Sequence, residues 1–438
     1  MTFSRLWLIL FALGIVPLLL SGLLSLGVAV AICWYLLLIG LALADWLLFP
    51  SLNSIFIERD VDEKLSLGTE NTVRVRVRNE TRFPLRMEVR DTPPEQVPND
   101  LHDLPLAFTV PPNTRHAATY TLSPLARGDY DFGDLFVRVR GRLGMIQRQR
   151  QIQASQRVKV YPNMKEAQRF NLLARRGRLQ QVGIRKARLQ GAGREFESLR
   201  DYQPDDELRR IDWKASARHS ALFAKEYRAE RDNNIVLAFD CGRTMVEPVA
   251  NIARLDRAIT AGLLVAYLSL KLGDRVMLFG FDSRPRVASA ALTGTSGFAT
   301  IRRVAGSLDY SAEETNFTLC LSTLAARLDR RSLIILFTDF TDAISAELML
   351  RSVGRLLERH VLLCVVLNDE ALEALVTAEP LAAAEVTRAV IAADLLRERR
   401  IVLTRLRRMG VEVLEASWRD LGPALAARYL DARRRRLR

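Results

Sequence analysis

Two aspartates each follow an apolar run that has the length of a buried strand. Asp240 ends "NIVLAFD", and Asp339 lies near the end of "SLIILFTDF". In an open α/β sheet the carboxyl ends of parallel strands share one edge, and ligands bind there. Thr244 in "DCGRTM" and Thr315 in "ETNF" add hydroxyl oxygens. Carboxylate and hydroxyl oxygens are the hard ligands that Mg²⁺ accepts while it keeps water in its other positions.

These four residues form a candidate magnesium site. The pattern also has a purely structural explanation, because aspartates at strand ends cap the helices and turns that follow. A metal-dependent hydrolase would need a general base near the ion. Only His219 and His360 are available in this half of the chain, and ordinary structural roles explain both.

Motifs for nucleotide or acyl chemistry are absent from the sequence. The run "GTSGFAT" has neither the spacing nor the lysine of a P-loop. The chain also contains no GxSxG or HExxH motif. We therefore expect no enzymatic activity, and a metal-dependent hydrolase is the least favoured alternative.

A doubly wound sheet would position the candidate site. Between residues 231 and 430, apolar runs of strand length alternate with segments of helical periodicity. The expected strands are "NIVLAFD", "DRVMLFGFD", "SLIILFTDF", "VLLCVVLND" and "VEVLEAS". The expected helices span 253–273, 297–308, 317–330, 346–360 and 382–409. Such alternation predicts an α/β fold with a mainly parallel sheet that is covered on both faces.

The order of these elements is similar to that of the von Willebrand factor A fold: a strand, then D-x-[GS]-x-[ST], a later T-[ND] loop, and a strand that ends in T-D. The resemblance implies that the positions of Asp240, Gly242, Thr244, Thr315 and Asp339 hold a divalent ion, which a partner's carboxylate completes. Gly242 stands where that family has serine, so one direct oxygen ligand is missing. The site either binds its ion through water, or the domain keeps the fold without the ion.

A charged segment precedes this domain: "GREFESLRDYQPDDELRRIDWKASAR", residues 193–218. Between Arg194 and Arg218 it has six basic and seven acidic side chains, a net charge of −1, together with three aromatic residues. A phosphate-binding patch would need a positive excess. Balanced charge with aromatic residues favours an ion-paired segment. It either clamps a neighbouring domain in place or forms a protein-docking surface.

The segment from 193 to 230 resembles the signature of the DUF58 proteins, a bacterial family of unknown function. The matching residues are Glu195, Phe196, Leu199, Arg200, Tyr202, Pro204, Asp206, Arg209, Ile211, Asp212, Trp213, Lys214, Ser216, Ala217 and Arg218. Asp205 replaces the family's glycine. The resemblance implies a membrane hairpin, a β-rich segment, a degenerate A-type domain and association with MoxR-type AAA+ ATPases.

The first 52 residues are apolar from Leu6 to Phe49, with Asp45 as the single charge in that run. One span needs about 20 apolar residues, so we expect a transmembrane hairpin of two helices, at about 6–24 and 27–49. One long tilted span or a buried core helix is the alternative. Arg5 favours a cytoplasmic N-terminus. The four cysteines form no disulfide or metal pattern, as in a reducing compartment. We expect a two-pass protein of the bacterial inner membrane with cytoplasmic domains.

Residues 57–161 alternate apolar and polar side chains. In "NTVRVRVRN", Val73, Val75 and Val77 alternate with arginines, as in half-buried strands of an antiparallel sandwich-like module. A basic linker is expected at 162–192. The tail 431–438 either continues the last helix or is solvated, and we favour the second.

The formal charge of +14 comes from arginine clusters that flank the folded segments. On a membrane-tethered protein such flanks favour attraction to the lipid bilayer over a specific nucleic acid. Together these features predict a membrane-anchored adaptor that partners a MoxR-type ATPase in the assembly or maturation of client proteins. The alternative is a structural membrane scaffold with a vestigial ion site.

Overall fold

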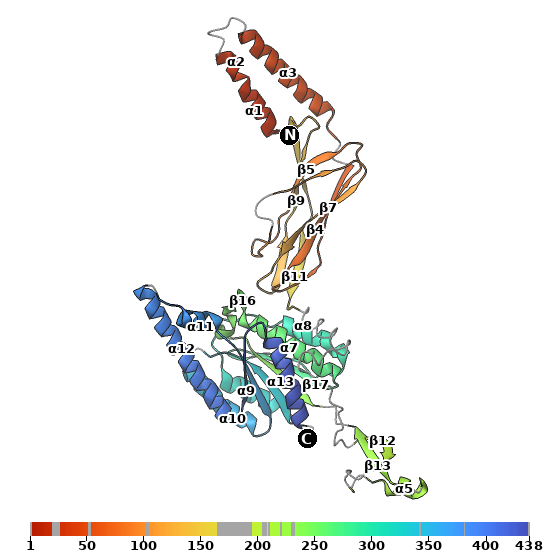
Figure 1. Cartoon of the computed structure of the whole chain (residues 1–438), viewed down its shortest axis with the longest axis vertical. Helices are drawn as coiled ribbons and strands as arrows, with labels where there is room; N and C mark the ends of the chain where they lie inside the picture. Colours follow the sequence, from red (N-terminus) through yellow and green to blue (C-terminus); the bar gives the residue numbers. More distant parts are fainter. Residues whose placement is uncertain are drawn as a thin grey trace. The chain divides into compact units, whose positions relative to one another are not determined.

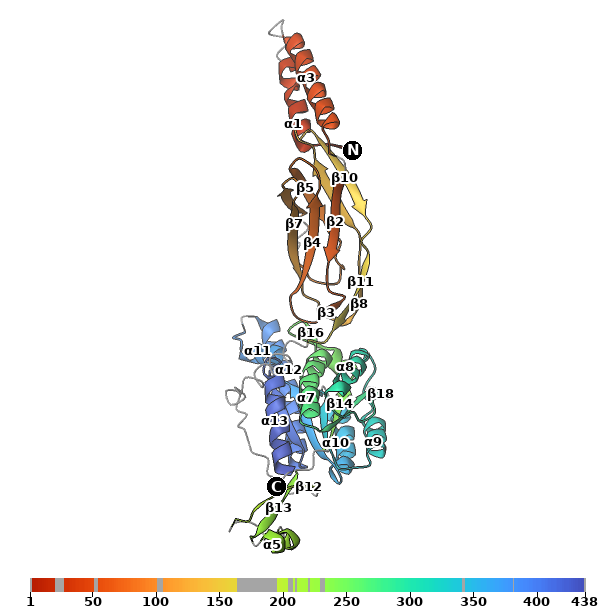
Figure 2. The ribbon, with the colours of Figure 1, turned by 90° about the vertical axis from the view of Figure 1, so that its right-hand side faces the viewer.

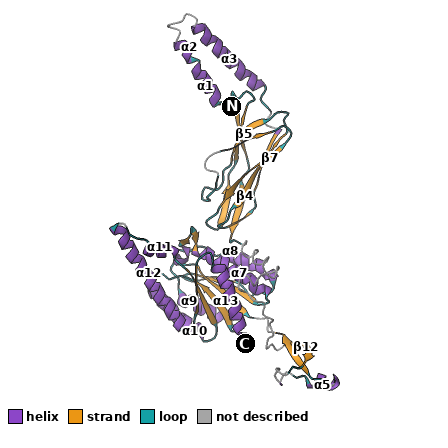
Figure 3. Ribbon diagram, viewed as in Figure 1, coloured by secondary structure: helices purple, strands orange, loops and turns teal. Residues whose placement is uncertain are grey.

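The structure is a computed structural model that describes residues 2–19, 27–50, 54–100, 105–163, 195–203, 208, 211–219, 221–228, 233–340, 343–380 and 382–436. The chain divides into two compact units, Met1–Tyr161 and Pro162–Arg438. The first contains apolar helices and mostly antiparallel sheets, and the second contains a mainly parallel sheet with helices (Figures 1 and 3).

Apolar helices begin the first unit: α1 (Arg5–Leu13), α2 (Ile15–Leu19) and α3 (Gly27–Leu47). Among the described residues, only α3 is long and apolar enough to cross a membrane. Its side chains are largely exposed, with Leu36 at 63%, so α3 is not the core helix of a soluble domain. The indole N–H of Trp34 in α3 donates to the Leu10 carbonyl in α1 at 3.0 Å.

The expected first span differs from the structure. Where one helix was predicted at 6–24, the chain forms the two shorter helices α1 and α2, and residues 20–26 lie outside the described part. Pro17 lies within α2, and proline lacks the N–H that a continuous helix needs. The structure therefore supports one candidate span.

Asp45, in the last turn of α3, joins this helix to the β module. Its carboxylate is fully buried and accepts hydrogen bonds from the N–H groups of Leu143 (2.8 Å), Met145 (2.9 Å) and Ile146 (3.0 Å). A Cβ at position 141 would collide with this carboxylate, so Gly141 is required there. Three aligned donors can hold a charge that would otherwise be costly to bury.

The β module spans three sheets (Figure 2). The first has the order β1 (Thr2–Phe3), β10 (Ile146–Ile152), β9 (Leu135–Arg140), β5 (Leu85–Arg90), β6 (Leu106–Val110). The second is β2 (Ile55–Asp60), β4 (Asn71–Asn79), β7 (Arg115–Leu122), and the third is β3 (Lys64–Ser66), β11 (Gln156–Tyr161), β8 (Gly128–Phe132). Val73, Val75 and Val77 are buried, while the arginines between them are exposed. The predicted alternation is confirmed.

The sheet of the second unit has the order β18 (Pro285–Ala288), β17 (Arg275–Phe281), β14 (Asn234–Asp240), β19 (Ser332–Phe337), β20 (Val361–Leu367), β21 (Glu412–Ala416). All neighbours are parallel except β17 and β18. A short hairpin, β15 (Pro248–Val249) and β16 (Ile252–Ala253), follows α6 (Arg243–Val246). Because four of five pairings are parallel, the strand ends share one edge.

Helices cover both faces of this sheet (Figure 1). One core packs against α7 (Arg254–Lys271), α8 (Phe298–Gly306) and α13 (Leu421–Arg436), and the other against α9 (Phe317–Arg327), α10 (Ala343–Leu357) and α12 (Ala383–Arg408). The remaining elements are η5 (Thr295–Gly297), α11 (Glu370–Thr377), and the signature elements β12 (Glu195–Asp201), α5 (Trp213–His219) and β13 (Phe223–Arg228). Alternate strand residues, such as Val236 and Leu237, enter opposite cores.

The predictions for the two basic segments, the linker at 162–192 and the tail at 431–438, compare differently with the structure. The expected linker at 162–192 lies outside the described residues from 164 onward. In the C-terminal tail, α13 continues to Arg436. Arg433 is buried, and its guanidinium lies 3.3 Å from the Asp274 carboxylate. The helix thus extends beyond residue 430, the alternative that we favoured less.

Candidate functional site

Three neighbouring strands end in a buried carboxylate at the same edge of the parallel sheet. Asp240 ends β14, Asp282 follows β17, and Asp339 follows β19 two residues after its end. The three residues are 0%, 1% and 4% exposed. Their side chains therefore depend on partners from the protein for their polar contacts.

Both carboxylate oxygens of Asp240 accept hydrogen bonds. Its Oδ1 accepts from the Thr315 hydroxyl at 2.6 Å and from the Gly242 N–H at 2.9 Å. Its Oδ2 accepts from the Thr338 hydroxyl at 2.7 Å. Burial raises the pKa of Asp240 to about 6, against the opposite effect of these hydrogen bonds. Among the described residues no cation pairs with this carboxylate.

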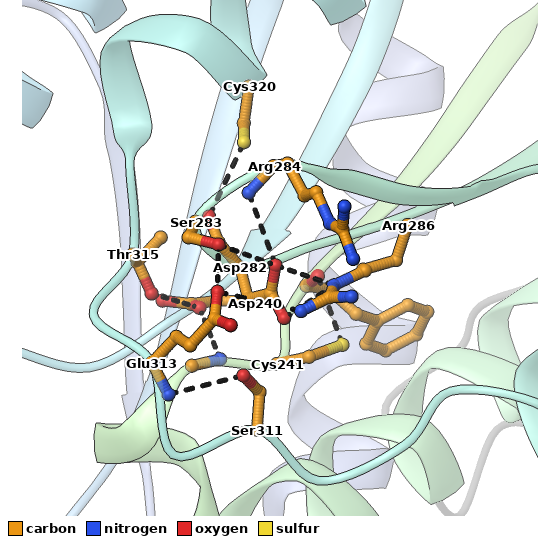
Figure 4. Close-up of polar contacts among 12 residues, drawn as sticks. Asp240, Cys241, Asp282, Ser283, Arg284, Arg286, Ser311, Glu313, Thr315 and Cys320 are labelled. Carbon is orange, nitrogen blue, oxygen red and sulfur yellow. Dashed lines mark hydrogen bonds and ion pairs between the residues drawn. The ribbon is translucent and has the colours of Figure 1, made fainter.

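Asp282 is stabilised by Arg286 of the following strand, β18 (Figure 4). The Arg286 Nε donates to both carboxylate oxygens at 2.8 and 2.7 Å, and the Arg284 N–H donates at 3.2 Å. Burial acts to raise the pKa of Asp282, but the hydrogen bonds from Arg284 and Arg286 outweigh it and hold the pKa below its usual value. Glu313 lies 3.6 Å from Arg286, which extends the cluster to the loop before α9.

Asp339 is neutralised by two arginines from different helices. Arg254, the first residue of α7, forms an ion pair with it, and a guanidinium nitrogen of Arg399 in α12 lies 3.3 Å away. Arg254 is also paired with Asp369, which follows β20. The Arg254 and Asp339 side chains are 7% and 2% exposed, so this is a buried ion-pair network that joins α7, α12 and two strand ends.

In the structure, the residues that the sequence placed in one site have different partners. Asp240 and Thr315 are in direct contact, as expected for two ligands of one site. Asp339 instead faces arginines. Thr244 is half-buried in α6, and a Cβ at position 242 would collide with the Thr315 hydroxyl oxygen. Because Gly242 has no side chain, Thr315 approaches the backbone at the position where the A-type family has serine.

The contacts of this donor set favour structural roles over a magnesium ion. Both Asp240 oxygens already accept from N–H and O–H donors. The Asp339 charge is balanced by Arg254 and Arg399, and a divalent cation next to two guanidinium groups would be repelled. Among the described residues, no group of three or more His, Cys, Asp or Glu side chains is arranged to hold a metal ion. Magnesium binding remains a prediction that the geometry does not favour.

Sequence reasoning missed Asp282, Thr338, Arg254 and Arg399. Asp282 carries the same signal as the two aspartates that were found, because it directly follows an apolar strand. Arg254 and Arg399 are 145 positions apart in the sequence. No local pattern predicts that both contact the same carboxylate.

His360 has a structural role, as expected. Its ring is buried, and its Nδ1 accepts from the Ser332 N–H at 3.2 Å. The side chain of His219 lies outside the described part of the chain.

The signature segment forms an antiparallel hairpin, β12 and β13, with the helix α5 between its strands. Asp212 caps α5: its Oδ1 accepts from the N–H groups of Lys214 at 3.0 Å and Ala215 at 3.1 Å. The hydrogen bond from the Ala215 N–H is the main cause that holds the pKa of Asp212 below its usual value. The Ser216 hydroxyl accepts from the Phe223 N–H at 2.9 Å. These signature residues therefore stabilise the segment itself.

Several other residues of the segment 193–230 are exposed. Trp213 is 66% exposed, and Leu208, Leu222 and Leu199 are 70%, 48% and 39% exposed. Tyr202 is half-buried, and Lys214 and Arg218 are exposed. Pro204, Asp206 and Arg209, and the side chains of Glu195, Phe196 and Arg200, lie outside the described part of the chain.

Residues 198–406 match the model of a family described as "Protein of unknown function DUF58", so this region is a DUF58 family domain. The uncharacterized protein YeaD of Bacillus subtilis is 32% identical over 200 residues, which are 44% of this chain and 49% of that protein. An uncharacterized protein of Mycobacterium tuberculosis is 24% identical over 181 residues, 41% of this chain and 56% of that protein. The chain thus matches about half the length of these relatives. A solved structure, the conserved hypothetical protein BatB from Bacteroides thetaiotaomicron, aligns with 41% of this chain and 98% of its own, at 11% identity and a TM-score of 0.25.

Proposed function

We propose that this chain, which carries a DUF58 family domain, is a membrane-anchored interaction protein without enzymatic activity of its own. Its N-terminal helices form a two-pass hairpin in the bacterial inner membrane, and both soluble units lie in the cytoplasm. Its α/β domain is of the von Willebrand factor A type. Its partner is an AAA+ ATPase of the MoxR type, and together they act in the assembly or maturation of client proteins.

The observation that carries this proposal is the exposure of Trp213. An indole that is 66% exposed on a seven-residue helix leaves a large apolar surface in water. Asp212 and Ser216, on either side of it, are used within the hairpin, so the segment does not need Trp213 for its own fold. Exposed tryptophan is the residue type that most often dominates protein–protein binding energy. We propose the docking role, in which a partner protein covers this indole.

The membrane anchor is supported by α3. Its 21 residues have a mean hydropathy of 2.4 in their most apolar window, and only 22% of that window is buried. The protein does not cover this apolar helix. Its length matches the length that a helix needs to cross a bilayer. Asp45, its one charged residue, is enclosed by the β module at the end of the helix.

Binding of a purified MoxR-type ATPase from the same organism tests the proposal. The full chain in neutral detergent is immobilised, and the Kd of the ATPase is measured in the presence of ATP. Trp213→Ala is expected to weaken binding by about 30-fold, because a central tryptophan contributes about 2 kcal/mol or more. Leu348→Ala, which truncates a side chain that is 50% exposed on α10, is the matched control and is expected to leave the Kd unchanged.

Two outcomes would contradict the proposal. If the ATPase binds wild type and Trp213→Ala equally well, the signature segment is not the docking element. If the ATPase does not bind the wild-type chain, the alternative of a structural membrane scaffold is favoured.

A further inference from the structure

The outer face of the sheet β2–β4–β7 carries a hollow of about 610 Å³. The register places Phe56 opposite Arg78 and Arg78 opposite Arg115, in one row across the three strands. The next row contains Glu58 and Arg76. Because successive side chains of a strand point to opposite faces, these residues lie on the face away from the buried valines of β4. Three guanidinium groups, one carboxylate and one phenyl ring therefore line the hollow.

The charges of this hollow favour an anionic ligand. Arg76 and Arg78 are paired with Asp60 and Glu80, but their side chains are 55% and 53% exposed. Exposed ion pairs of this kind contribute little, so either arginine can exchange its carboxylate for a phosphate at small cost. Arg115 is exposed, and among the described residues it forms no ion pair. Arg115 is thus a guanidinium available to a ligand.

An apolar group lies beside these charges. Phe56 is 54% exposed, although it is an aromatic residue in a strand. A ligand that has a phosphate and an adjoining apolar part would satisfy both the arginines and this ring, whereas inorganic phosphate would leave the ring in water. Glu58 and the carboxylates paired with Arg76 and Arg78 interrupt the positive charge, and a nucleic acid backbone needs a continuous positive surface.

The hollow lies near the end of α3. β2 begins at Ile55, eight residues after α3 ends at Leu47, and eight residues reach at most about 28 Å. The row of Phe56 lies at the end of β2 where the chain arrives from α3, and the Glu80 N–H donates to the Ser54 carbonyl there at 3.0 Å. Asp45 ties α3 to the same module. A bilayer around α3 would therefore place its headgroups within reach of the hollow.

We propose that this hollow binds the headgroup of an anionic phospholipid. Arg78 and Arg115 bind the phosphate, and Phe56 packs against the glycerol and the first methylene groups. The site depends on the proposed membrane anchor. Lipid bound in the hollow fixes the position of the β module on the bilayer surface. A soluble phosphate compound and a nucleic acid are the competing ligands that the test must separate.

The full chain in neutral maltoside detergent is titrated with dihexanoyl-phosphatidylglycerol, and bound lipid is measured by native mass spectrometry. The same titration with dihexanoyl-phosphatidylcholine, inorganic phosphate and a short single-stranded DNA tests the ligand class. Phosphatidylglycerol is expected to bind at least about 10-fold more tightly than the other three. Phosphatidylcholine has no net negative charge, inorganic phosphate has no apolar part to cover Phe56, and DNA needs a continuous positive surface.

Two variants test whether the lipid binds in this hollow. Arg115→Gln is expected to weaken phosphatidylglycerol binding by about 10-fold. The matched control is Arg74→Gln, which changes an exposed arginine on the same strand face, one row beyond the hollow, and is expected to change binding by less than about 2-fold. Equal effects of both variants, or equal binding of inorganic phosphate or DNA, would overturn the proposal.

A separate experiment tests whether the proposed membrane anchor is correct. Membranes from cells that express the chain are extracted with alkaline carbonate, which releases proteins that do not span the bilayer. A chain that is released but still binds phosphatidylglycerol through Arg115 contradicts the proposed anchor and leaves the hollow as a lipid site. A chain that stays in the membrane while Arg115→Gln binds normally contradicts the hollow alone.

Discussion

At the scale of single residues, the α/β domain stabilises three buried carboxylates in three ways. Asp240 is held by hydroxyl and backbone donors, Asp282 by one arginine of the following strand, and Asp339 by Arg254 and Arg399. An unpaired carboxylate would be costly to bury. The chain therefore supplies from its own helices the positive charge that a metal ion would otherwise bring to Asp339.

Replacement of Arg254 by methionine tests this view. The substitution leaves Asp339 and Asp369 close together with less compensating charge, and loss of one partner of a buried pair typically costs about 3–5 kcal/mol. We expect the unfolding free energy of the full chain in detergent to fall by about that amount. The double variant Arg254→Met/Asp339→Asn is expected to recover part of it, and MgCl₂ or EDTA should not shift the wild-type melting temperature.

Arg243→Met is the matched control. Its ion pair with Glu314 is 3.3 Å long, and the two side chains are 62% and 76% exposed, so its loss should cost less than about 1 kcal/mol. A wild-type melting temperature that rises with Mg²⁺ would instead support an ion at this edge of the sheet.

The pH dependence of stability reports on Asp240. Its pKa in the folded chain is about 6, above the usual 3.8, because of burial. The folded state therefore holds this proton more tightly than the unfolded state, and the stabilisation is complete below about pH 4 and is lost as the pH rises through 6. Measured by thermal unfolding in EDTA, wild type should lose up to about 3 kcal/mol relative to Asp240→Asn between pH 4 and pH 7. Parallel curves for the two proteins would show that Asp240 titrates normally.

At the scale of elements, α3 and the β9–β10 loop form one structural unit through Asp45. The loop turns tightly enough to aim three N–H groups at one carboxylate. The strand β1 adds a second connection, because it pairs with β10, and the Ser4 N–H donates to the Met145 carbonyl at 2.9 Å. The helix α3 and the β module are therefore joined by direct contacts as well as by the chain between them.

Removal of this carboxylate should loosen the loop. In Asp45→Ala the N–H groups of Leu143, Met145 and Ile146 lose their acceptor, and a lost charged hydrogen bond costs about 1.5–3 kcal/mol. We expect amide hydrogen exchange at these positions to accelerate by at least about 10-fold. Asp62→Ala, at an exposed position in the same module, is the control. Unchanged protection of the loop would show that the β1–β10 pairing alone holds it.

At the scale of the whole molecule, two compact units each contain their own stabilising polar network. In the first, Arg59 is buried in an ion pair with Asp91, to which Tyr120 also donates at 2.7 Å. In the second, Tyr429 of α13 donates to Asp274, which also faces Arg433. These arginines are buried in ion pairs with aspartates, which leaves the net charge of +14 unchanged. The arginine count alone therefore overstates the surface available to lipid or nucleic acid.

The sequence alone determined the elements whose physical signal is local. Apolar continuity predicted the parallel strands, the alternation at Val73–Val77 predicted the half-buried strand, and the signature predicted the DUF58 domain. It also identified Asp240 with Thr315 as neighbours. These signals depend on the periodicity of a strand or helix, which a short stretch of chain contains in full.

Tertiary structure decided which partners the functional side chains have. Arg254 and Arg399 reach Asp339 only because two distant helices pack at the same strand ends. Likewise, Asp45 is enclosed by a loop about 100 positions away, and Arg78 and Arg115 become neighbours through strand register. Electrostatic contacts act through space across distances of a few ångströms. Sequence separation therefore carries no information about them until the fold is known.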